Sequence, residues 1–262
     1  MPHTIRRSDL KSRQAAFWLA SQLTRYPADD LAELLADFLG MPEAVAACEV
    51  STGALGDLLP HLRQVVTDPA SLVLWQYAYV DLFDRAAARN PLGESGYGKD
   101  GGMRKGWILA DLAGFYTAFG LDFQQGEAGA EMGDHVAVQL QFYDLLLLKE
   151  SELIRIGDRP GQDIVHDARR GFLSEHLGRF VDGIAERPMI QGHGVYNAIF
   201  AWARDLVSDE CRRLDVKRDA APWQAVTGPS GPMVCGACPA AQAADTTTDC
   251  ETSCSSSEAN HE

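Results

Sequence analysis

The sequence contains no apolar run that could span a membrane, and it has few basic residues. The 262-residue chain carries 23 Lys and Arg against 37 Asp and Glu, a formal net charge of −14. A membrane-spanning helix needs about 20 consecutive apolar residues, so we expect no membrane insertion. Nucleic-acid binding needs clustered Lys and Arg, and the acidic balance argues against it. The charge suits a basic partner, or it only keeps the chain soluble.

Cysteine is scarce through most of the chain. Of six cysteines, Cys48 and Cys211 stand alone and the other four crowd the C-terminal end. A small secreted domain would instead spread its disulfide framework through the fold. Arg6 and Arg7 loosely resemble a twin-arginine export signal, but Ser21 interrupts the apolar stretch that follows, and no cleavage site is evident. We therefore expect a cytoplasmic protein whose thiols are reduced or metal-bound.

Apolar residues recur with helical spacing through most of the chain. Steps of i, i+3, i+4 and i+7 predict helices over residues 16–23, 31–38, 55–66, 72–83, 108–119, 136–148, 165–184 and 195–207. No alternating strand pattern and no internal repeat is found. The sequence therefore predicts an all-α fold, with a single helical-bundle domain over residues 1–218.

Two Gly-rich segments interrupt the helical pattern. Residues 90–102 contain a proline and several glycines, and residues 122–133 are polar and Gly-rich, so both are predicted to be loops. Gly120 is predicted to end the helix before the second loop. Asp134 is predicted to cap the N-terminus of the helix after it.

The C-terminal end has a different composition. Pro, Gly, Ser, Thr and Ala dominate it, so residues 219–262 are predicted to form a flexible, disordered tail. The tail holds two close cysteine pairs, Cys235 with Cys238 and Cys250 with Cys254. Such pairs bind zinc or an iron–sulfur cluster, or act as redox thiols. A tail whose thiols have no role is a further interpretation.

The segment Gly93–Asp100 fits part of a phosphate-binding loop, G-x-x-x-x-G-K. Asp100 stands where such a loop needs a Ser or Thr to bind magnesium, and no strand is predicted before it. Nucleotide hydrolysis is therefore disfavoured relative to a plain surface loop. A peptide-binding loop is a third interpretation, because loops on rigid scaffolds often carry function.

Two further groups have both structural and functional interpretations. The neighbours Asp134 and His135 form either an acid–base pair or a helix cap, and capping is favoured because no nucleophile can be placed beside them. The aromatic residues of 72–83 belong mostly to the core, although a helix apolar at nearly every position also suits a groove for a partner helix. Four other histidines lack metal-ligand spacing and are assigned no function: His61, His166, His176 and His193.

Several short motifs occur in a fixed order along the chain. They are Tyr79–Arg85, then Pro91, Ser95 and Tyr97, then Glu131, Asp134 and His135 with Leu140 and Phe142, and finally Phe172–Leu177. As an ordered set they resemble the motifs of the TorD/DmsD/NarJ family of redox-enzyme maturation chaperones, in its respiratory reductase and dehydrogenase branch. The resemblance covers residues 12–215.

The resemblance implies an all-helical cytoplasmic chaperone of anaerobic respiration, which is not an enzyme and requires no cofactor. Its implied partner is the catalytic subunit of a molybdopterin-containing reductase or dehydrogenase. The chaperone would bind the twin-arginine leader of that subunit and assist cofactor insertion before export. By matching position, the implied leader-binding residues are Tyr79, Leu82, Phe83, Pro91, Ser95, Tyr97, Asp134 and His135. The alternative is a metal-binding or thiol redox protein, which acts through zinc or an iron–sulfur cluster on the tail cysteines.

Overall fold

The computed structural model describes residues 7–52, 55–87, 89–98, 104–121, 131–218 and 223–225. Within these ranges the chain forms helices and no strand, and two isolated β-bridges are the only extended pairing. The all-α prediction is confirmed. No described helix is long and apolar enough to cross a membrane. The cysteines predicted as metal ligands, at positions 235, 238, 250 and 254, lie outside the described residues.

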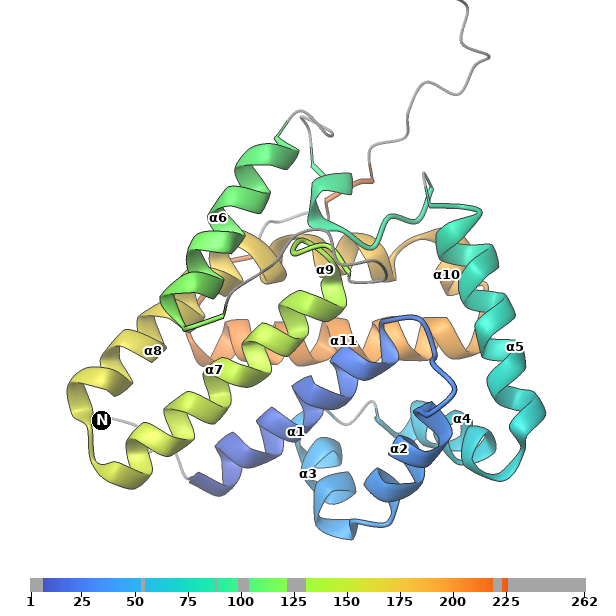
Figure 1. Ribbon diagram of the computed structural model, residues 1–262, viewed down its shortest axis with the longest axis horizontal. Helices are drawn as coiled ribbons and strands as arrows, with labels where there is room; N and C mark the ends of the chain where they lie inside the picture. Colours follow the sequence, from blue (N-terminus) through green and yellow to red (C-terminus); the bar gives the residue numbers. More distant parts are fainter. Residues whose placement is uncertain are drawn as a thin grey trace, which may run out of the picture. The chain divides into compact units, whose positions relative to one another are not determined.

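Most of the helices follow one another with short connections, and longer loops precede and follow α6 (Figure 1). They are α1 (Arg7–Leu23), α2 (Leu31–Leu39), α3 (Pro42–Thr52), α4 (Leu55–Thr67), α5 (Pro69–Tyr79), α6 (Lys105–Ala118), α7 (Val136–Ile156), α8 (Arg159–Phe172), α9 (Gly178–Ala185), α10 (Pro188–Gln191) and α11 (Gly194–Arg213). Short turns are the π-helices η1 (Val80–Asp84) and η3 (Leu173–Leu177) and the 3₁₀-helix η2 (Glu94–Gly96). Every predicted helix is present. The helices α3 and α10 were not predicted, because no apolar stripe marks α3 and α10 has only four residues.

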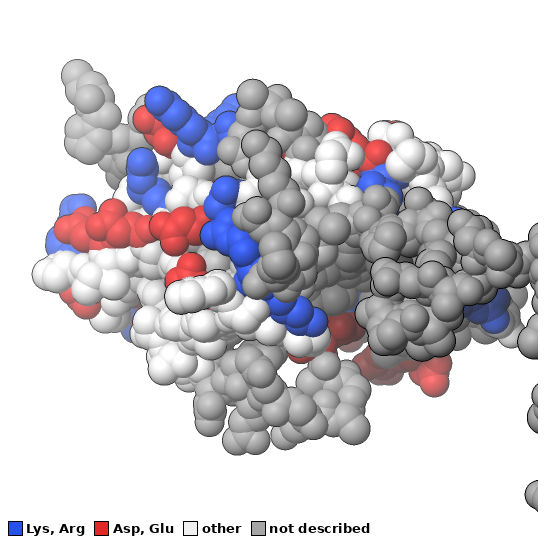
Figure 2. Space-filling view, turned by 90° about the horizontal axis from the view of Figure 1, so that it is seen from above, with Lys and Arg blue, Asp and Glu red and all other residues white. Residues whose placement is uncertain are grey.

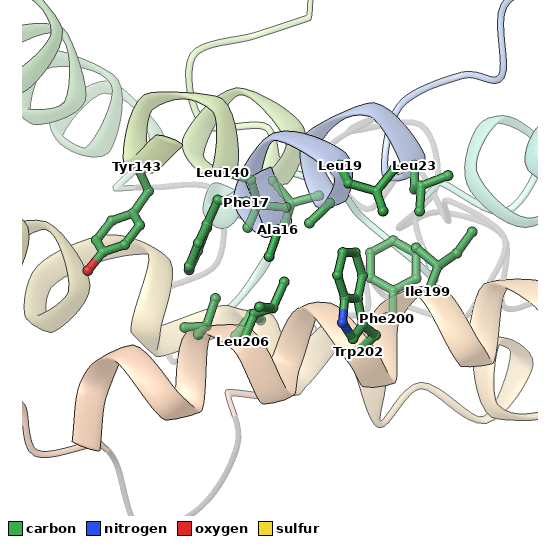
Figure 3. Packing of buried hydrophobic residues seen from close by; sticks show 14 of the residues in the cluster. Ala16, Phe17, Leu19, Leu23, Leu140, Tyr143, Ile199, Phe200, Trp202 and Leu206 are labelled. Carbon is green, nitrogen blue, oxygen red and sulfur yellow. The ribbon is translucent and has the colours of Figure 1, made fainter. Parts of the chain in front are cut away.

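The centre of the molecule is formed by α1, α7 and α11. Figure 3 shows Leu19 of α1 and Ile199 and Trp202 of α11 pointing toward one another between the two helices. On the other side of α1, the rings of Phe17 and Tyr143 lie 4.5 Å apart. All five side chains are fully buried. Each contributes on the order of 2 kcal/mol through removal of apolar surface from water, so this contact region stabilises the bundle that carries every site below.

A group of buried charged side chains joins the central helices to α8. Arg169 donates to Glu150 and, at 2.5 Å, to Glu210, and its Nε donates to the Tyr143 hydroxyl at 3.1 Å. Arg13 donates to the other oxygen of Glu210 at 2.7 Å. Burial alone would raise the pKa of Glu210, but the guanidinium groups of Arg169 and Arg13 hold that pKa below its usual value. Because each charge has a partner of opposite sign, the group can stay ionised inside the core.

Two five-residue π-turns interrupt the helical geometry. The turn η1 extends α5, and η3 joins α8 to α9, so the predicted helix over 165–184 is two α-helices with a π-turn between them. Gly178 directly follows η3, and a Cβ atom there would lie 2.3 Å from the carbonyl oxygen of Leu173. Only glycine fits at that approach.

Candidate functional site

The motif residues of η1 form a buried aromatic group. The Tyr79 ring lies 5.0 Å from Phe83 and 5.6 Å from Tyr26, and Phe83 lies 5.2 Å from Tyr196. Tyr79, Leu82 and Phe83 are all buried, and burial raises the pKa of the Tyr79 hydroxyl far above its usual range. These predicted leader-binding residues therefore lie together but offer little surface. Tyr26, which is 44% exposed, is the member of the group that reaches solvent.

The loop after η1 folds tightly onto the domain. Asn90 donates its amide to the Leu82 carbonyl at 3.0 Å, which fastens the loop to η1. The hydroxyl of Tyr97 donates to the Pro91 carbonyl at 2.7 Å, and this bond closes the loop on itself. Tyr97 is buried, whereas Pro91 and Ser95 are half-buried. Of the predicted Pro–Ser–Tyr set, only the first two reach the surface.

The start of α7 corrects one prediction. The N-cap of this helix is His135, whose Nδ1 accepts from the Ala137 backbone N–H at 3.2 Å. Asp134 instead accepts the backbone N–H of Ser95 at 3.2 Å. The prediction that Asp134 caps α7 was therefore wrong by one residue, because the Asp134 carboxylate binds the backbone of the neighbouring loop instead. Burial lowers the pKa of His135 to about 4, so the ring is neutral near neutral pH. Its Nδ1 is used as a cap, which leaves no acid–base pair.

Three of the ordered motifs meet at Glu94, a residue that sequence reasoning missed. Its side chain is 2% exposed and accepts from Gln139 of α7 at 2.9 Å. Nδ1 of His176, in η3, lies 3.1 Å from the same oxygen. The Glu94 backbone N–H donates to the Asp134 carbonyl at 2.9 Å. A single glutamate among loop glycines gave no sequence signal for this role. Its charge, beside that of Asp134, also argues against phosphate binding by the 93–100 loop.

Residues 223–225 lie across the same loop. The Gly98 backbone N–H donates to the Gln224 carbonyl at 3.1 Å, and the guanidinium of Arg179 lies 4.2 Å from the centre of the Trp223 ring. A Cβ atom at Gly183 would lie 2.1 Å from the Trp223 carbonyl oxygen. This part of the range that the sequence predicts as tail therefore packs against the helical domain.

An exposed rim lies above the buried aromatic group. We use the name rim for Tyr26, Asp84 and Glu131. Glu131 is half-buried, and its carboxylate lies 3.5 Å from Nε2 of His135. Burial raises the pKa of Glu131, Arg25 opposes that rise and Asp84 adds to it. The rim thus places the carboxylates of Asp84 and Glu131 near the exposed ring of Tyr26, beside the buried aromatic group.

An apolar strip lies along the exposed face of α5. Val73, Leu74 and Tyr77 are 45%, 64% and 68% exposed, and they share one face because Val73 and Leu74 lie four and three residues before Tyr77. Asp81 continues that face and is also exposed. Part of 72–83 thus faces away from the core, and its use as a groove for a partner helix stays a prediction. The strip is apolar at its N-terminal end and acidic at its C-terminal end.

A shallow hollow between α1 and α2 also combines apolar and acidic side chains. It has a volume of about 330 Å³ and is lined by Trp18, Asp30, Glu33, Leu34, Asp37, Phe38 and Met41. Elsewhere charge is mixed. On the face seen from above, acidic and basic side chains of the described residues lie beside one another with uncharged surface around them (Figure 2). The net acidity of the chain therefore does not by itself select a binding surface.

Residues 50–186, slightly more than half of the chain, match the family model of the nitrate reductase delta subunit. The chain belongs to this family. The matched region contains η1, the loop after it, the start of α7 and η3, which hold all the ordered motifs. The nitrate reductase delta family is the NarJ/TorD-type chaperone family, so the resemblance is confirmed. Membership agrees with a role in molybdoenzyme maturation beside a catalytic subunit. No curated protein and no solved structure matches the chain.

Proposed function

We propose that this chain is a cytoplasmic chaperone without catalytic turnover. It binds the twin-arginine leader of a molybdenum enzyme's catalytic subunit and assists cofactor insertion before export. The observation that carries this proposal is the exposed rim of Tyr26, Asp84 and Glu131, which stands on the buried motif residues of the nitrate reductase delta family.

The chemistry of the rim suits such a leader, which has paired arginines followed by an apolar stretch. Carboxylates bind guanidinium groups through paired, charge-assisted hydrogen bonds, and the exposed Tyr26 ring offers a face for cation–π contact. The apolar strip of Val73, Leu74 and Tyr77 can receive the apolar stretch as a helix. The buried residues Tyr79, Leu82, Phe83, Tyr97, Asp134 and His135 then support the surface rather than touch the peptide. Pro91 and Ser95 remain proposed contacts.

Affinity capture from the native host under anaerobic conditions, followed by mass spectrometry, tests the partner. We expect a molybdopterin-enzyme catalytic subunit with its leader still attached. Recovery of no such subunit, together with metal on the tail cysteines, would replace the proposal with the metal or thiol redox alternative.

Leader binding then tests the site, measured by fluorescence anisotropy of a labelled peptide. The variant Asp84→Asn/Glu131→Gln is expected to bind at least about tenfold more weakly, since two charge-assisted contacts are lost. The matched control is Asp30→Asn/Glu33→Gln/Asp37→Asn in the hollow, which should bind normally. Loss of binding in the control alone would assign the leader to the hollow. Equal binding of the native leader and of one with both arginines replaced by glutamine would refute the mechanism.

A further inference from the structure

A second group of titratable side chains lies between α6 and η3. It consists of Asp111, Glu175 and His176, whose nearest donor atoms all lie within 4.8 Å of one another. Nε2 of His176 is 3.3 Å from Oδ2 of Asp111. The histidine is 2% exposed, whereas both carboxylates reach solvent. Solvent can therefore reach the two carboxylates, whereas the imidazole is enclosed by the protein.

The two ring nitrogens of His176 face different carboxylates, Nδ1 that of Glu94 and Nε2 that of Asp111. Nδ1 lies 3.1 and 3.3 Å from the two oxygens of Glu94. An ionised carboxylate only accepts, so the Nδ1–H must donate there. In the neutral ring Nε2 then carries a lone pair, and it has no hydrogen-bond partner among the described residues. A lone pair beside carboxylate oxygens repels them unless a cation lies between the nitrogen and the oxygens.

We propose that Nε2 of His176 and the carboxylates of Asp111 and Glu175 bind a divalent transition-metal ion of the zinc class. Zinc holds nitrogen and carboxylate oxygen at about 2.0–2.1 Å, so neighbouring ligands of a tetrahedral site lie roughly 3.4 Å apart. The Nε2–Oδ2 distance of 3.3 Å agrees with that edge. The exposed Glu175 side chain is free to turn inward. An imidazole ligand favours zinc or its neighbours over magnesium or calcium.

The surroundings of His176 agree with a metal ligand. A histidine that binds metal usually donates its other ring N–H to a carboxylate, which fixes the ring's orientation, and Glu94 supplies that carboxylate. Gln139 in turn orients Glu94 with a hydrogen bond of 2.9 Å. The ligands Glu175 and His176 lie in a π-turn, a geometry that is common at functional sites. With three protein ligands, the fourth position faces solvent.

Such an ion would join α6 to η3. In α6 Leu112 and Tyr116 are buried, and the Phe115 ring packs against Phe172 and His176, so α6 already contacts η3 through apolar and aromatic side chains. Asp111 lies beside Leu112 on the same helix. We therefore expect the bound ion to fix α6 and to raise the melting temperature of the protein.

Isothermal titration of the full-length chain with zinc chloride near neutral pH tests the site. The four tail cysteines are replaced by serine and any histidine tag is removed, so that neither competes. We expect one ion per chain. Asp111→Asn and Glu175→Gln should each weaken binding at least about tenfold. Because both residues are exposed, urea unfolding can show that these variants fold normally. The control Asp167→Asn, an exposed acid of α8, should bind like the parent.

Three results would overturn the proposal. The first is no binding by the serine-substituted chain when the native chain binds zinc, which would place the metal on the tail. The second is equal binding by Asp111→Asn, Glu175→Gln and the parent. The third is a nitrogen-15 spectrum at neutral pH that shows a doubly protonated His176 unchanged by zinc, since a proton would then occupy the place of the ion.

Discussion

Two charged groups in this molecule, one fully buried around Arg169 and one partly buried around His176, differ in how their charges balance. Around Arg169, two guanidinium groups face the two carboxylates of Glu150 and Glu210, and the Tyr143 hydroxyl fills the remaining position. Around His176, the carboxylates of Glu94 and Asp111 face one imidazole. Among the described residues, no Lys or Arg forms an ion pair with either of these two carboxylates.

The comparison shows that charge balance, more than burial, separates a structural ion pair from a candidate site. A buried pair contributes little net stability, but it stays in place when each charge is compensated. The Arg169 group is complete, so it needs nothing from solution. The His176 group has two carboxylates and no permanent positive charge, so we expect it to bind a divalent cation.

The largest expected effect comes from breaking the complete group. Arg169→Met leaves Glu150 and Glu210 buried without their main partner, so the free energy of unfolding should fall by about 3–5 kcal/mol. Urea denaturation near neutral pH measures it. The control is Arg155→Met, which removes the exposed pair with Glu152 and should change the free energy of unfolding far less. If Arg169→Met lowers the free energy of unfolding no more than Arg155→Met does, the buried ion pairs of Arg169 do not hold the fold together.

His135 is a second buried histidine, and it stays neutral in the folded protein, so it can be compared with His176. The folded-state pKa of His135 is about 4, below the usual 6.5. As the pH falls from 6.5 to 4, the unfolded chain gains a proton that the folded chain does not, so stability is lost, by up to roughly 3 kcal/mol. His135→Asn keeps an N-cap acceptor without titrating. Urea unfolding across this pH range should therefore show a shallower decline in the variant, and parallel curves would contradict the assigned role.

The smallest expected effect comes from a substitution in the His176 group, whose charges are not balanced. In protein freed of metal by a chelator, Asp111→Asn replaces a repelling oxygen with an amide donor for Nε2 of His176. The free energy of unfolding should rise by roughly 0.5 kcal/mol, a low value because Asp111 is largely exposed. Chemical denaturation with and without zinc measures both states. A decrease in the stability of the metal-free variant would instead indicate that a protonated His176 is held by Asp111.

The sequence predicted the helices well where an apolar stripe faces one core. It missed α3, because the apolar residues of that helix form no stripe on one face. It also placed the α7 cap on Asp134, since a preference for Asp carries no information about the loop that binds its carboxylate. The family motifs marked the correct region, but most of their residues are buried. Asp111 and His176 are far apart in sequence, so their proximity required the fold.

The π-turn η3 has a consequence for the helices on either side of it. A residue in an α-helix advances the direction of its side chain by about 100°, so the extra residue in η3 shifts the phase of everything that follows. Before the turn α8 packs on α7, and after it α9 packs on α11. Deleting one residue within Leu173–Leu177 would restore an unbroken α-helix and rotate Phe180, Val181 and Ile184 away from α11. The turn thus allows one continuous helical segment to pack against α7 before the turn and against α11 after it.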